Sequence, residues 1–92
     1  MIRSFRCAET RGIYEGKRSR RFSTFRCVLE RKLLLLDAAT SIDDLRSPPG
    51  NRLEALLGDR KGQHSIRIND QFRICFRWTP GGPDDVEVVD YH

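Results

Sequence analysis

The apolar residues of the first half of the chain recur at intervals of three and four, which is the spacing of one helix face. They are Phe22, Phe25, Leu29, Leu33 and Leu36. This spacing predicts a helix over residues 20–39. A weaker helical pattern covers residues 8–16 and is closed by Gly16, and the short alternating segment Met1–Phe5 is compatible with a strand.

After Asn51 the apolar spacing changes to two, which predicts strands separated by polar turns. The predicted strands are Leu53–Leu57, His64–Ile68, Phe72–Trp78 and Val86–Tyr91. Before them, Ser41 followed by Asp44 is typical of a capping box that starts a short helical turn. Pro48 and Pro49 then break the chain.

One face of the predicted sheet is apolar. It consists of His64, Ile66, Ile68, Phe72, Ile74, Phe76, Trp78, Val86 and Val88. Helices followed by antiparallel strands are typical of an α+β fold, in which the helices pack on one face of a mainly antiparallel sheet. A length of 92 residues suits a single domain, residues 1–92, with one core and no room for a buried cofactor.

Arginine dominates the basic residues, because only Lys17, Lys32 and Lys61 among the seventeen are lysine. The planar guanidinium matches phosphate groups, so this bias favours the recognition of an anion or a nucleic acid. A GC-rich genome explains the same bias equally well when it is taken alone.

The three cysteines have no spacing that suggests a disulfide framework or a zinc site, and a reduced cytoplasmic setting is expected. The longest apolar run, Leu33–Leu36, is far shorter than the roughly twenty residues of a membrane span. Arg3 and Arg6 interrupt the first apolar residues, so no secretory leader and no membrane partner are expected.

A three-residue turn at Asn69–Gln71 pairs Ile66 with Ile74 and keeps one sheet face apolar. A two-residue turn would instead set Ile66 opposite Arg73. On the polar face, the three-residue turn sets Arg67 directly opposite Arg73. Such a like-charge pair costs stability unless an anion binds there.

The register of the last hairpin extends this polar row. Setting Trp78 opposite Val86 pairs Arg73 with Tyr91, so that Arg67, Arg73 and Tyr91 form one row across three strands.

The same register pairs Arg77 with Glu87, which we interpret as an ordinary surface ion pair. His64 is interpreted as a core histidine. By parity, Asp90 and His92 fall on the other face, at the last rung, where sheet twist would have to bring them round the edge.

Arginines beside a histidine or tyrosine are suited to cleaving RNA, because RNA supplies its own nucleophile. A base deprotonates the 2′-hydroxyl, arginine stabilises the charge on the phosphate, and an acid protonates the leaving 5′-oxygen. The sequence offers no clustered metal ligands and no phosphate-binding glycine loop, so we expect no metal and no cofactor. Residues 58–62 resemble a basic hairpin tip that contacts RNA through Arg60 and Lys61.

At these residues the chain resembles the RelE/ParE superfamily of bacterial toxins, and specifically its HigB-type plasmid maintenance killer branch. The segments that carry the resemblance are Met1–Phe5, Pro49–Leu56, Gly58–Gly62, Ser65–Asn69, Phe72–Trp78 and Val89–His92. Each is a modest signal alone, but their order and the total length are highly specific.

The resemblance implies a toxin of a type II toxin–antitoxin system that cuts mRNA at the ribosomal decoding site. The products would be a 2′,3′-cyclic or 3′-phosphate and a 5′-hydroxyl, and translation and growth would stop. The implied fold is a compact α+β domain with helices packed on a curved antiparallel sheet. The implied partner is a helix-turn-helix antitoxin of the HigA type, which inactivates the toxin and carries the complex to operator DNA.

By position in the family's motifs, Arg73 would stabilise the phosphate, Tyr91 and His92 would position the substrate and transfer protons, and Asp90 would accompany them. The residues expected to bind RNA are Arg60, Lys61, Arg67, Asn69 and Gln71.

Members of the branch can place a histidine or lysine on the strand before Gly58, where this chain has Glu54 and Leu57. The general base is therefore open. Two alternatives stay open as well: a toxin that poisons gyrase, and a weakened toxin that acts mainly by binding its antitoxin. The codon preference, the antitoxin interface and the stoichiometry of the complex are not encoded in any recognisable pattern.

Overall fold

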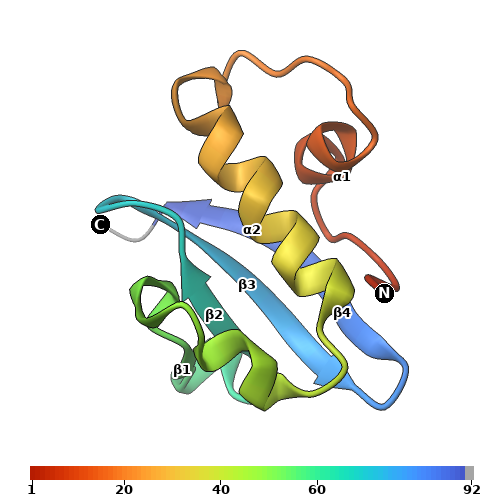
Figure 1. Cartoon of the computed structure of the whole chain (residues 1–92), viewed down its shortest axis with the longest axis vertical. Helices are drawn as coiled ribbons and strands as arrows, with labels where there is room; N and C mark the ends of the chain where they lie inside the picture. Colours follow the sequence, from red (N-terminus) through yellow and green to blue (C-terminus); the bar gives the residue numbers. More distant parts are fainter. Residues whose placement is uncertain (91–92) are drawn as a thin grey trace.

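Two helices pack on a four-stranded antiparallel sheet, as the computed structural model shows for residues 1–90 (Figure 1). The helices are α1 (Ala8–Tyr14) and α2 (Arg26–Ala38), and the strands are β1 (Glu54–Ala55), β2 (His64–Arg67), β3 (Phe72–Thr79) and β4 (Gly82–Asp90). The strand order is β1-β2-β3-β4. The predicted α+β architecture is confirmed. No helix within residues 1–90 is long and apolar enough to cross a membrane.

The helix over residues 8–16 is confirmed as α1, and Gly16 closes it with a φ of 86°. The predicted helix over residues 20–39 starts too early, because a 3₁₀ turn, η1 (Ser23–Phe25), precedes α2. Phe22 and Phe25 are both buried, with their ring centroids 5.6 Å apart. A 3₁₀ turn places side chains three residues apart above one another, which turns both rings into the core.

The capping box is confirmed. The side chain of Asp44 accepts hydrogen bonds from the backbone N–H groups of Thr40 at 2.9 Å and Ser41 at 3.3 Å. These bonds hold the pKa of the Asp44 carboxyl below its usual range. They start the 3₁₀ turn η2 (Ile42–Arg46), which is followed by a second turn, η3 (Pro49–Asn51).

The register between β2 and β3 is as predicted, with Ile66 opposite Ile74 and Arg67 opposite Arg73. Asn69 closes the turn, since its side-chain oxygen accepts hydrogen bonds from the N–H groups of Gln71 and Phe72 at 2.9 and 2.8 Å. An asparagine in this position replaces a backbone turn with its own side chain.

The predicted register between β3 and β4 is wrong. Trp78 lies opposite Pro83, and Arg73 lies opposite Val89. A tight turn pairs Thr79 with Gly82, so β4 begins four residues before the predicted start, and a bulge at Asp85, with a φ of 53°, adds one residue to β4. The start of β4 was not predicted, because residues 82–85 lack an alternating apolar pattern.

The first and second extended segments are shorter than predicted. Met1–Phe5 forms no regular strand: it makes one isolated parallel bridge, from Phe5 to Val86, along the outer edge of β4. The expected strand Leu53–Leu57 reduces to the two residues of β1. Its neighbour Leu57 is exposed, so the alternation there does not reflect a buried face.

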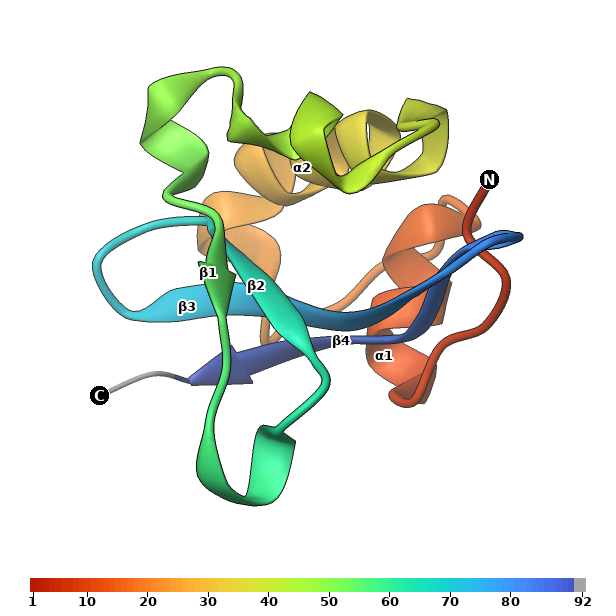
Figure 2. The same cartoon turned by 90° about the horizontal axis from the view of Figure 1, so that it is seen from below.

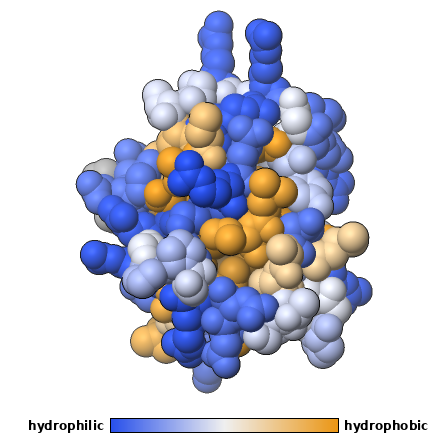
Figure 3. Space-filling view, in the orientation of Figure 1, coloured by the Kyte–Doolittle hydropathy of each residue, from blue (hydrophilic) through white to orange (hydrophobic). Residues whose placement is uncertain are grey.

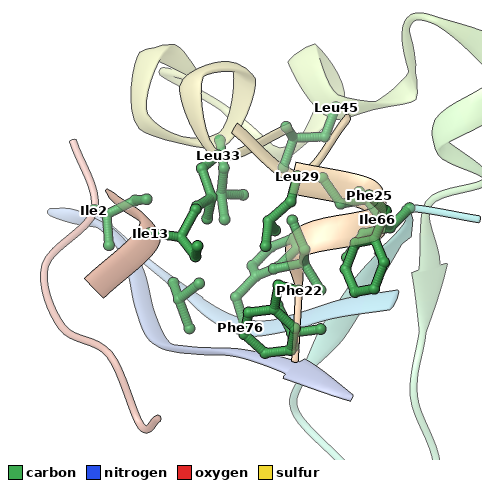
Figure 4. Close-up of a cluster of buried hydrophobic side chains, with 14 of the residues drawn as sticks. Ile2, Ile13, Phe22, Phe25, Leu29, Leu33, Leu45, Ile66 and Phe76 are labelled. Atoms are coloured by element: carbon green, nitrogen blue, oxygen red, sulfur yellow. The ribbon is translucent and has the colours of Figure 1, made fainter. Parts of the chain in front are cut away.

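The core lies between the helices and the apolar sheet face, as predicted (Figure 4). The members of this hydrophobic cluster with no exposed surface are Phe22, Leu29, Leu36, Ile66, Ile74, Phe76 and Val86. Because successive strand residues point to opposite faces, the residues between these in β2, β3 and β4 form a second, polar face. The connection between β1 and β2 turns away from α2 and lies on that side (Figure 2).

Candidate active site

The polar face consists of two neighbouring rows of residues that run across the strands. One row contains Arg67 and Arg73. In the other row, Glu54, Ser65, Cys75 and Glu87 lie opposite one another across all four strands. Arg60, in the turn η4 (Gly58–Arg60) between β1 and β2, donates a 2.8 Å hydrogen bond to Glu87 on β4. A side chain from the connection between β1 and β2 therefore spans the polar face and reaches β4.

Arg73 lies on this polar face with 8% of its surface exposed. Its Nε donates to Ser65 Oγ at 2.8 Å, and its Nη2 donates to the carbonyl oxygens of Arg52 at 2.6 Å and Ser65 at 3.4 Å. A buried guanidinium is stable only with such partners. These bonds fix the guanidinium before any substrate arrives, which is the arrangement that stabilises developing charge most effectively.

The carbonyl that holds Arg73 Nη2 comes from a constrained backbone. Arg52 has a φ of 44°, in the left-handed region that residues with a side chain rarely adopt. Beside it, Asn51 is fully buried, accepts a hydrogen bond from Lys32 Nζ on α2, and donates to the Leu45 carbonyl at 3.1 Å. A chain of polar contacts therefore runs from α2 to Arg73.

Glu54 is a site residue whose role the sequence left open. Its Oε1 lies 4.0 Å from Arg73 Nη1, and its side chain is 54% exposed. The residue is therefore a carboxylate at the mouth of the arginine site. The pairing of Glu54 with Ser65 in β1 and β2 places it there. A sequence signal existed in the alternation of β1, but only the register with β2 connects it to Arg73.

Arg67 and Arg73 lie opposite each other, and each has oxygen partners within the chain. Arg67 Nη2 donates to Asp70, three residues along in the turn, while Arg73 is held by carbonyls and Ser65. The cost of the like-charge pair is thus reduced within the fold, and the pair by itself does not require a bound anion.

Asp90 is not brought to Arg73. It lies opposite Phe72. It is on the other face of β4 from Val89, as the alternation of strand residues predicted. Its Oδ2 accepts a 3.0 Å hydrogen bond from Gln71. The residue opposite Arg73 is Val89, where the sequence predicted Tyr91. Tyr91 and His92, predicted as catalytic, lie outside the described residues.

The other predicted RNA-binding residues lie around the rim. Arg60 Nη1 contacts both Glu87 and Gln63, so it holds the β1–β2 connection over the polar face. Lys61 is exposed beside it, and Asn69 uses its side-chain oxygen to close the β2–β3 turn.

Cys75 lies between Ser65 and Glu87 in the sheet and is fully buried. Burial raises the pKa of its thiol, Glu87 raises it further, and Arg60 and Arg73 oppose that shift. A thiol held protonated is a poor nucleophile.

The chain is similar to known proteins in both sequence and structure. Residues 4–92 match a protein family described as the RelE-like toxin of the type II toxin-antitoxin system HigB. A Vibrio cholerae serotype O1 protein named Toxin HigB-1 is 49% identical over 70 residues, which cover 74% of each chain. An uncharacterized protein of Haemophilus influenzae is 45% identical over 51 residues, or 55% of this chain and half of that one.

Among solved structures, the chain is similar to one in the YoeB-YefM complex from Staphylococcus aureus. The TM-score is 0.62 at 15% sequence identity, and the match covers 100% of this chain and 98% of the other. At this identity the likeness establishes a shared fold.

Proposed function

Because the chain belongs to the HigB family of RelE-like toxins of type II toxin–antitoxin systems, we propose that it cleaves mRNA on the ribosome as an endoribonuclease. The family confirms the resemblance read from the sequence. The observation that carries the proposal is the buried, pre-oriented guanidinium of Arg73 on the polar face of the sheet, with the Glu54 carboxylate 4.0 Å away.

The reaction needs a base, a charge stabiliser and an acid. Glu54 accepts the proton of the 2′-hydroxyl, whose oxygen then attacks the adjacent phosphorus. Arg73 donates hydrogen bonds to the non-bridging oxygens as negative charge grows on them. The bond to the 5′-oxygen breaks, and that oxygen takes a proton from His92 or Tyr91. The products are a 2′,3′-cyclic phosphate and a 5′-hydroxyl.

Glu54 suits the role of base because it is half-exposed, where a ribose can reach it, and lies against the arginine that would hold the phosphate. Arg67 and Lys61 on the rim would contact neighbouring phosphates.

Cleavage of mRNA on programmed ribosomes tests the assignment. Glu54→Gln should lower the cleavage rate by about 10²- to 10⁴-fold, the usual contribution of a general base. Arg73→Lys should lower it by about 10²- to 10³-fold, because an ammonium cannot replace the oriented fork. Glu15→Gln, which neutralises an exposed carboxylate beside Lys17, is the matched control and should cut at the parent rate. Glu54→Gln with an undiminished rate would remove Glu54 from the mechanism.

The position of Glu54 also favours a second candidate, a weakened toxin whose main activity is antitoxin binding. A carboxylate against Arg73 competes with phosphate for the same guanidinium. The two candidates predict opposite signs: neutralising Glu54 slows cleavage if it is the base, and speeds cleavage if it only blocks Arg73.

The partners follow from the same proposal. The toxin would act in the cytoplasm on the ribosomal decoding site, and a helix-turn-helix antitoxin of the HigA type would hold it inactive and bring it to operator DNA. Co-expression with an adjacent antitoxin gene should restore growth. Messages left intact beside broken DNA would point to gyrase as the target.

A further inference from the structure

The segment between α1 and α2 concentrates the positive charge of the chain. Residues 17–26 include five of the seventeen basic residues and none of the thirteen acidic ones. The remainder of the chain is therefore slightly acidic. In Figure 3, hydrophilic side chains protrude at the end of the molecule where this connection arches in Figure 1.

Two of these arginines have no carboxylate to neutralise them. Lys17, Arg21 and Arg26 form ion pairs with Glu15, Glu9 and Glu30, at 3.4, 3.7 and 3.5 Å. Within residues 1–90, no carboxylate oxygen lies within 4.0 Å of Arg18 or Arg20, and both side chains are exposed.

Arg18 and Arg20 line a hollow of about 300 Å³ together with Arg26, Ser19 and Ser23. The wall is fixed to the rest of the protein. Arg26 Nη1 donates a 2.6 Å hydrogen bond to the Lys17 carbonyl, which ties the two ends of the segment together. Phe22 in the middle of the segment is fully buried and anchors it to the core.

The hollow lies at the same end of the molecule as the β2–β3 turn. The ring of Phe25 stacks on the ring of Phe72, with centroids 4.6 Å apart. Phe72 directly precedes Arg73 in β3 and follows Gln71, a predicted RNA contact. A nucleic-acid strand with a phosphate at Arg73 can therefore continue round this end of the molecule towards the hollow.

We propose that the hollow lined by Arg18, Arg20 and Arg26 binds phosphate groups of an RNA backbone, as a second contact separate from the Arg73 site. The proposal rests on the proposed function. Guanidinium groups match phosphate geometry bidentately. The hydroxyls of Ser19 and Ser23 already donate to Glu9 Oε2 and to the Arg20 carbonyl, both at 3.0 Å, so the guanidinium groups supply the donors of the site. A protein partner would need an apolar anchor. Within residues 1–90, the exposed large apolar side chains all lie outside residues 17–26: they are Met1, Tyr14, Leu34 and Leu57.

The test compares Arg18→Ala/Arg20→Ala with Arg11→Ala/Arg46→Ala, which removes the same charge from exposed positions on α1 and η2. Binding is measured against salt concentration with two probes, a 2′-O-methyl RNA oligonucleotide that cannot be cleaved and the intact ribosome. For single-stranded RNA, the slope of log K against log salt should become shallower by about 0.7 for each phosphate that the protein no longer neutralises. The first variant should show this shallower slope and the control should not.

A shallower slope with the oligonucleotide identifies message phosphates, and one confined to the ribosome identifies ribosomal RNA; both support the site. Slopes equal to those of the control with both probes would overturn it. So would a variant that binds RNA normally and fails only to bind its antitoxin. Neither probe depends on cleavage. If the parent protein cuts no mRNA but the two variants still differ in slope, the proposed nuclease function is refuted and the proposed phosphate site in the hollow stands.

Discussion

Ser65 Oγ accepts the hydrogen bond from Arg73 Nε, and both residues are buried. Ser65→Ala leaves that N–H without its partner where water cannot easily replace it. The free energy of unfolding should fall by about 1–3 kcal/mol. Urea denaturation measures this change, with Thr24→Ala, at an exposed position, as the control. An unchanged urea midpoint would mean that Arg73 finds another partner and that its orientation is not fixed by Ser65.

Cys75 and Cys27 offer a second comparison at the scale of single residues, because one is buried and the other exposed. Alkylation of Cys75 in the folded protein should be at least about a hundredfold slower than that of Cys27, since the thiol reacts only after opening. Mass spectrometry of the labelled peptides measures both rates. Equal rates would contradict the burial of Cys75 in the folded protein.

The raised pKa of Cys75 also sets a pH dependence. Above the ordinary thiol pKa of 9.0 the unfolded chain ionises while the folded thiol stays protonated, so the contribution to stability is lost as pH rises. The urea midpoint of the parent should therefore fall more steeply above pH 9.0 than that of Cys75→Ala. Parallel curves would show that the thiol ionises equally in both states.

At the scale of elements, the contact from α2 to the turn η3 determines where Arg73 lies. Burial, with Arg31 and Arg67 nearby, lowers the pKa of the Lys32 ammonium, so this charge is held in a costly position. Asn51 accepts a hydrogen bond from that ammonium and also donates to two carbonyls, those of Leu45 and Ser47.

Asn51→Ala should therefore destabilise the fold by about 2–3 kcal/mol, because buried polar groups on both sides lose their partner. It should also lower the rate of mRNA cleavage. The backbone of Arg52, next to Asn51, would no longer be held in its left-handed conformation, and the Arg52 carbonyl would no longer orient Arg73. Lys32→Met should cost less, because it removes the charge together with its desolvation penalty. Urea denaturation and the cleavage assay compare the two variants. A Lys32→Met protein less stable than Asn51→Ala would reverse the assigned roles.

The elements also show how far the sequence reaches. Apolar spacing predicted α1, most of α2, the apolar sheet face and the pairing of Arg67 with Arg73, because burial imposes those periods. The start of β4 was missed, since Gly82–Asp85 is polar and its strand conformation depends on the tight turn and the bulge. The approach of Glu54 to Arg73 was missed because it depends on the register of β1, a strand of two residues.

For the whole molecule, the Arg73 site and the basic hollow are linked by one ring contact, since Phe25, next to Arg26, stacks on Phe72, next to Arg73. The rest of the surface is close to neutral, so a polyanion would meet the protein in one orientation. Charge placed this way steers encounter and adds little to the stability of the fold.

Because Arg73 is buried, a substitution there should affect growth arrest without affecting antitoxin binding. Arg73→Lys keeps a cation in the buried site and changes no exposed surface, because Arg73 is 8% exposed. The variant should lose growth arrest, since an ammonium lacks the fork that holds phosphate, yet should still bind the antitoxin. Induction in cells and co-purification with the antitoxin measure the two properties. Continued growth arrest by a folded Arg73→Lys protein would show that toxicity does not depend on this guanidinium.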